Sequence, residues 1–101
     1  MSQLQESIET IILAVDFTAV SLSVEADKDC IFDTEGALLN SDFVVQYQLL
    51  LTKLAADSYS RVLVTTADQL ALFPESCVVV PTLGEAEDLI EMDRIQRDLG
   101  F

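Results

Sequence analysis

Apolar residues occur along this chain in short runs and in helical stripes, separated by polar turns. Runs rich in Ile, Leu and Val at residues 10–17, 61–66 and 78–80 are typical of buried strands. Residues 20–24 alternate apolar and polar side chains, and residues 30–32 form a short apolar run, so we expect strands there as well. Together these segments predict a sheet of about four strands.

Helical periodicity marks three further segments. Ser41 is expected to cap a helix, because Phe43 and Tyr47 begin a series of apolar residues at three- and four-residue spacing. Residues 67–73 predict a short helix that Pro74 stops. Thr82 is expected to cap a final helix, with a glutamate three residues later completing a capping box. Strands and helices alternate in the second half of the chain, which favours a sheet that is at least partly parallel.

Composition limits the function classes. The chain has 101 residues, half of them apolar, which suits one modest core, so residues 1–101 are predicted to form a single α/β domain. Its 18 acidic residues against 5 basic ones give a net charge of −13, which disfavours direct binding to nucleic acids or anionic membranes. Without histidine, imidazole-dependent catalysis and the commonest metal ligand are excluded.

The cysteines and the N-terminal segment indicate a cellular compartment. Cys30 and Cys77 stand in apolar, strand-like contexts, and we interpret them as buried free thiols of a reducing cytosol. The first residues lack a basic leader, and no apolar run is long enough to span a bilayer. The chain is therefore expected to be a cytoplasmic protein of bacterial type. Because it also lacks histidine, we expect it not to be an enzyme and to need no cofactor.

The C-terminal segment, residues 81–99, resembles the end of STAS domains, the family similar to anti-anti-sigma factors. The elements that carry the resemblance are, in order, Pro81-Thr82, Glu85-Ala86, Asp88, Met92-Asp93 and Arg97-Asp98-Leu99. They cover about a fifth of the chain, and helix-capping chemistry explains only the first few of them. The resemblance implies a STAS-like α/β fold, with helices packed on a mixed sheet, and binding to another protein, such as an anti-sigma-like kinase or another regulator.

The family also carries a switch loop between a strand and a helix. Asp33, Thr34, Glu35 and Gly36 stand at the matching place, and the resemblance implies that Glu35 occupies the position of the family's phosphorylated serine. A carboxylate there carries permanent negative charge and cannot be switched by a kinase, although Thr34 still offers a hydroxyl. The alternative interpretation is a polar turn in which Gly36 adopts a positive φ.

A second hypothesis is a small metal-dependent nuclease similar to PIN domains. Asp16, Asp33 and Asp68 follow predicted strands, and three carboxylates at one sheet edge could hold a divalent metal ion and activate water. Against this hypothesis, carboxylates occur almost everywhere in so acidic a chain, and few basic residues are present to hold a nucleic acid.

The final helix carries two apolar faces. Leu83, Ala86, Leu89 and Ile90 share one face, whereas Met92, Ile95 and Leu99 lie on nearly the opposite one. One straight helix cannot bury both faces against the same sheet, so either the helix bends near Glu91 or the second face meets a partner or a second copy of the chain. The interface is accordingly predicted at Met92, Ile95, Leu99 and Phe101.

Overall fold

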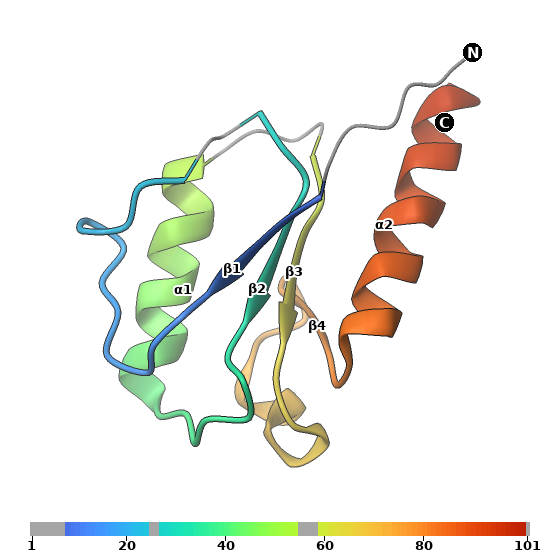
Figure 1. Ribbon diagram of the computed structural model, residues 1–101. Coiled ribbons are helices and arrows are strands. Elements are labelled where there is room, and N and C mark those ends of the chain that lie inside the picture. The colour runs from blue at the N-terminus through green and yellow to red at the C-terminus, as the bar shows by residue number, and fades with distance from the viewer. Residues whose placement is uncertain (1–7, 25–26, 55–58, 101) are drawn as a thin grey trace.

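The computed structural model describes residues 8–24, 27–54 and 59–100, which form one sheet with helices on both faces (Figure 1). The strands are β1 (Glu9–Ile12), β2 (Cys30–Asp33), β3 (Arg61–Val64) and β4 (Val78–Val80). The helices are α1 (Ser41–Leu54), the 3₁₀ helix η1 (Ala67–Leu72) and α2 (Leu83–Asp98).

The sheet has the strand order β1-β2-β3-β4, and all three strand pairs are parallel. The α/β class, the four strands and the packed helices are therefore confirmed, and no antiparallel pair occurs in the described part of the sheet. Within those residues, neither α-helix has the length and apolar character needed to cross a bilayer.

Alternating side chains along the strands build two separate cores. Cys30 and Phe32 of β2 point toward α1, whose apolar stripe of Phe43, Tyr47, Leu50 and Leu54 is buried against them. Ile31, between them, points the other way and packs with Ala86 and Ile90 of α2. Figure 1 accordingly shows α1 and α2 on opposite faces of the sheet.

Three local expectations are corrected. The first strand ends at Ile12, and residues 20–24 form a turn and an irregular segment in place of a strand. This connection is held on α1, because Gln46 Oε1 accepts from Ala19 N at 2.9 Å and Lys53 Nζ donates to Leu22 O at 2.7 Å. At the start of α1, the cap is Asn40, not Ser41, because Asn40 Oδ1 accepts from Phe43 N at 2.9 Å.

Candidate functional site

The predicted switch loop is a tight turn at the carboxyl end of β2. Asp33 Oδ1 accepts a hydrogen bond from Glu35 N at 2.9 Å, and Ala37 N donates to Thr34 O at 3.0 Å. Glu35 and Gly36 have φ values of 54° and 76°, so both stand in the left-handed region. The prediction of a positive φ at Gly36 is confirmed, and Glu35 shares this conformation without glycine's freedom.

The hydroxyl of Thr34 is turned into the protein. Thr34 is 2% exposed, and its Oγ1 donates to Val64 O of β3 at 2.9 Å. The neighbouring carboxylate of Glu35 is exposed to solvent. A kinase would have to open this turn to reach the Thr34 hydroxyl, whereas the negative charge of Glu35 is already displayed.

Gln69 of η1 holds the loop from the side, a role that sequence reasoning missed. Its Oε1 accepts from Leu39 N at 2.7 Å, and its Nε2 donates to Ala37 O at 2.9 Å and to Thr65 Oγ1 at 3.0 Å. The side chain is buried, so these bonds satisfy polar groups that water does not reach. A lone amide inside the apolar segment of residues 67–73 was the available signal.

The three aspartates of the nuclease hypothesis do not form a metal site. Asp16 lies in the turn after β1, Asp33 ends β2 and Asp68 lies in η1. Among the described residues, which include all three, no group of three or more Cys, Asp or Glu side chains is placed to hold a metal ion. Asp33 Oδ1 instead accepts from the backbone of its own turn.

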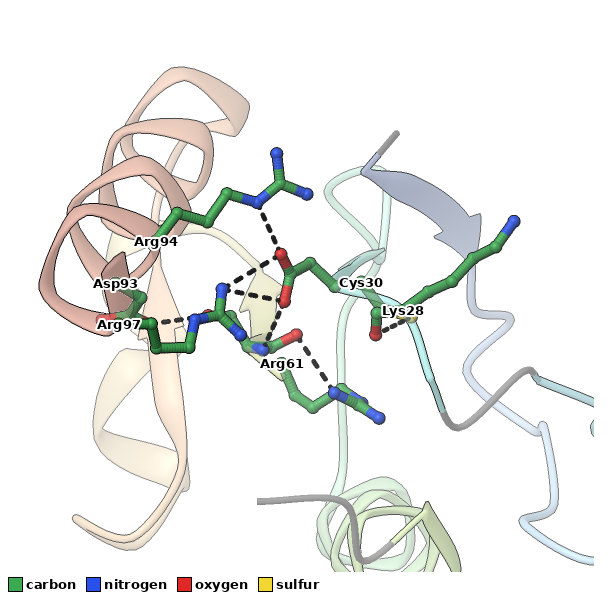
Figure 2. Close-up of polar contacts among 8 residues, drawn as sticks. Lys28, Cys30, Arg61, Asp93, Arg94 and Arg97 are labelled. Carbon is green, nitrogen blue, oxygen red and sulfur yellow. Dashed lines mark hydrogen bonds and ion pairs between the residues drawn. The ribbon is translucent and has the colours of Figure 1, made fainter. Parts of the chain in front are cut away.

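A cluster of charged residues at the amino end of the sheet was not predicted. Asp29, which precedes β2 and is 2% exposed, pairs with Arg94 Nε at 2.7 Å and with Arg97 Nη2 at 3.2 Å. Figure 2 shows both arginines reaching from α2 toward the sheet. Ser60 N, which precedes β3, donates to Asp29 Oδ1 at 2.7 Å, and Ser60 Oγ donates to Asp93 Oδ2 at 2.7 Å. The cluster therefore ties α2 to the starts of two central strands.

The environment of Asp29 favours its charged form. Burial by itself raises the pKa of this carboxyl group, but the hydrogen bonds from Ser60 N, Arg94 and Arg97 outweigh that effect and hold the pKa below its ordinary value. We therefore interpret the buried Asp29 carboxylate and its two guanidinium partners as a cluster that stabilises the fold and not as a binding site. The carboxylate oxygens are already occupied by Ser60, Arg94 and Arg97.

The outer face of α2 carries the predicted interface residues. Met92, Ile95 and Leu99 are 56%, 59% and 64% exposed, whereas Ala86 and Ile90 on the inner face are fully buried. We call Met92, Ile95 and Leu99 the outward stripe. The helix runs unbroken past Glu91, so the bend is not observed and the second apolar face points into solvent. The fourth predicted residue, Phe101, lies outside the described residues.

The structure does not bring the loop and the outward stripe together. The loop follows the carboxyl end of β2, whereas Arg94 and Arg97, which are interleaved with the stripe residues in α2, contact Asp29 at the amino end of the same strand. The two candidate surfaces therefore stand at opposite ends of the sheet.

One groove lies on the other side of the molecule, between α1 and the segment that connects β1 to β2. It has a volume of about 580 Å³ and is lined by Thr18, Ala19, Val20, Gln46, Leu49 and Lys53. Its lining is mainly apolar, and Lys53 Nζ is bonded to the carbonyl groups of Ala19 and Leu22. The residues that line the groove include no acidic side chain, so the groove holds no acid–base pair for catalysis.

Both cysteines are buried and free, as the sequence predicts. Burial raises the pKa of the thiols of Cys30 and Cys77, which disfavours the reactive thiolate. They pack in the same core as α1.

Comparisons with protein-family models, with curated proteins and with solved structures give no match to this chain.

Proposed function

We propose that the chain is a protein-binding regulatory module, similar in role to an anti-sigma factor antagonist, and that it meets its partner through the outward stripe. The observation that carries this proposal is the exposure of Met92, Ile95 and Leu99 on the face of α2 opposite the buried Ala86 and Ile90. Single exposed apolar residues are common on protein surfaces, but three aligned along one helix form a continuous surface that a partner can desolvate.

The loop geometry supports a module without a phosphorylation switch. The hydroxyl of Thr34 is buried and donates to Val64 O, and Glu35 displays a permanent negative charge. Phosphorylation acts by adding charge to an accessible hydroxyl. A module of this kind would bind in one fixed state and would be regulated by its abundance or by its partner.

Affinity capture from a lysate of the source organism tests the proposal. The tagged chain is compared with the variant Met92→Gln/Ile95→Gln/Leu99→Gln and with the matched control Val45→Gln/Leu49→Gln, which alters two exposed apolar residues of α1. We expect a protein that the native chain and the control retain and that the stripe variant loses. Equal unfolding free energies in urea would show that the variants are folded.

Two results would contradict the proposal. Retention of the same proteins by the stripe variant would remove the stripe from the interface. Loss of binding in the α1 control alone would move the interface to the groove beside Leu49.

A further inference from the structure

The outward stripe has the spacing of a coiled-coil seam. Met92, Ile95 and Leu99 are separated by three and four residues, which places them at successive a, d and a positions of a heptad. Leu99 follows the last helical residue but keeps the helical bond, because its N donates to Ile95 O at 3.1 Å. One turn before Met92, the d position is occupied by Asp88. The buried residues of α2, Ala86 and Ile90, fall at b and f, so the seam faces away from the sheet.

Charges on α2 are divided between its two faces. Arg94 and Arg97, the basic residues of the helix, both pair with the buried Asp29 on the inner side. Glu91 and Asp98 occupy the g positions that flank the seam, and both are exposed. The g side of the outward stripe is therefore acidic, whereas its e side carries the uncharged Leu89 and Gln96. Arg94 and Arg97 are directed toward the sheet.

From this arrangement we infer that the docking segment of the partner is a cationic amphipathic α-helix lying lengthwise on α2. Apolar residues of that helix pack between Met92, Ile95 and Leu99, as knobs do in a coiled coil. Its Lys or Arg side chains face Glu91 and Asp98, and one more faces Asp88. This inference rests on the proposed function and names the chemistry of the partner.

Charge favours a cationic helix over a second copy of the chain as the partner at the outward stripe. An antiparallel pair of α2 helices would set Glu91 against Asp98, and a parallel pair would set Asp88 against Asp88. Two chains with a net charge of −13 each also repel one another as they approach. A cationic helix meets the same seam with attraction at every charged position.

The size of the seam determines the kind of binding to expect. From Asp88 to Leu99 it extends for about 18 Å, roughly three turns. So short a contact gives an affinity in the micromolar range and a strong dependence on salt, because the flanking charges are exposed.

A defined peptide tests the inference on the intact chain. The probe is a labelled peptide of about three heptads with Leu at a and d and Lys at e and g, titrated in fluorescence anisotropy at low and at physiological salt. One control peptide has Glu in place of Lys, and another has the same residues in shuffled order without heptads. We expect the heptad Lys peptide to bind and both controls to bind at least about tenfold more weakly.

Variants separate the apolar contribution from the charged one. The stripe variant Met92→Gln/Ile95→Gln/Leu99→Gln keeps every charge and is expected to lose about tenfold or more in affinity. Glu91→Gln/Asp98→Asn keeps the apolar seam and is expected to lose about fivefold and to flatten the salt dependence. Asp42→Asn/Glu75→Gln removes as much charge at exposed positions elsewhere and is expected to change affinity less than about twofold.

The inference is overturned if the shuffled peptide binds as well as the heptad peptide, or if the distant charge variant weakens binding as much as Glu91→Gln/Asp98→Asn. It is also overturned if sedimentation shows a dimer that the stripe variant loses, since the occupant would then be a second copy. Binding to phosphatidylcholine vesicles that depends on the stripe would assign the surface to lipid.

The inference and the proposed function can fail separately. A lysate protein that needs the outward stripe but is neither released by salt nor displaced by the Lys peptide would keep the proposed function and overturn the cationic helix. Binding of the peptide, with no lysate protein that requires the stripe, would confirm the chemistry of the surface and overturn the proposed function.

Discussion

Arg94 Nε donates to Asp29 Oδ2 at 2.7 Å, and so joins the outer helix to the start of a central strand across 65 positions of sequence. Asp29 is 2% exposed, whereas the side chains of Arg94 and Arg97 are 24% and 33% exposed. The carboxylate therefore depends on these ion pairs more than the arginines do, because both arginine side chains retain some contact with water, although Arg94 Nη2 is itself buried.

Replacing Asp29 by Asn should destabilise the fold by about 2–4 kcal/mol, since Arg94 and Arg97 lose their counter-charge while the acceptor for Ser60 N is kept. Urea denaturation measures the change. The control is Asp27→Asn, an exposed aspartate two residues away, for which a change within about 0.5 kcal/mol is expected. Equal effects of the two substitutions would contradict the role assigned to the cluster.

Stability should fall in acid partly through Asp29. Because the pKa of this carboxyl is lower in the folded state than its ordinary value of 3.8, the unfolded chain binds more protons between the two values. Its contribution to stability is complete above the unfolded pKa and is lost as the pH falls through the folded pKa. We expect the difference in unfolding free energy between the native chain and Asp29→Asn to shrink between pH 7 and about pH 2.5. A difference that grows in acid would contradict this prediction.

Gln69→Ala should cost about 2–3 kcal/mol, because Leu39 N and Ala37 O lose their buried partner. Hydrogen exchange at the Leu39 amide should accelerate beyond the global change. Gln48→Ala, at an exposed position of α1, is the matched control and should be nearly neutral. Unchanged protection at Leu39 would show that Gln69 does not hold the loop.

Two glycine substitutions should have opposite signs. A Cβ added at Gly36 or at Gly84 meets no atom within 4 Å, so neither substitution creates a clash with neighbouring residues. Gly36 has a φ of 76°, and Gly36→Ala should destabilise by about 1 kcal/mol. Gly84 is in the first turn of α2, and Gly84→Ala should stabilise by up to about 1 kcal/mol. Thermal unfolding of both variants measures the contrast, and a shift of the same sign in both would refute it.

Tyr47→Phe should leave stability unchanged or raise it by up to about 1 kcal/mol. The Tyr47 hydroxyl is fully buried, and no hydrogen-bond partner is found for it among the described residues. Tyr47→Ala, which removes the ring that packs edge-on against Phe32 and Phe73, should instead cost about 3–5 kcal/mol. A large loss in the Phe variant would reveal a bond that this geometry lacks.

Local periodicity predicted most of the architecture. Apolar runs located β2, β3 and β4, and the stripe beginning at Phe43 located α1, because a chain of this size buries the faces that its periodicity marks. Residues 20–24 were wrongly predicted as a strand. Leu22 and Val24 are partly buried against the core that includes α1, and Lys53 binds the Leu22 carbonyl, whereas Val20 is exposed, so the alternation does not reflect strand pairing.

The sites were predicted unevenly for the same reason. The outward stripe follows from helical arithmetic within one segment, so Met92, Ile95 and Leu99 could be found from sequence. The Asp29 cluster depends on contacts between residues more than sixty positions apart. The hydrogen bonds of Gln69 depend on where the backbone of Ala37 and Leu39 runs in the folded chain. Neither leaves a pattern in neighbouring residues, because each forms only when distant segments have been brought together.

The long reach of the Asp29 cluster has a consequence for the order in which the nascent chain can fold. Until α2 has been synthesised, Asp29 has neither guanidinium partner, and the sheet face that carries Ile31 and Val62 has no cover. Contacts at such separation add to the entropy that must be lost before they contribute to stability. We therefore expect a shortened chain that ends before α2 to expose the apolar sheet face of Ile31 and Val62 and to leave the Asp29 carboxylate without its guanidinium partners.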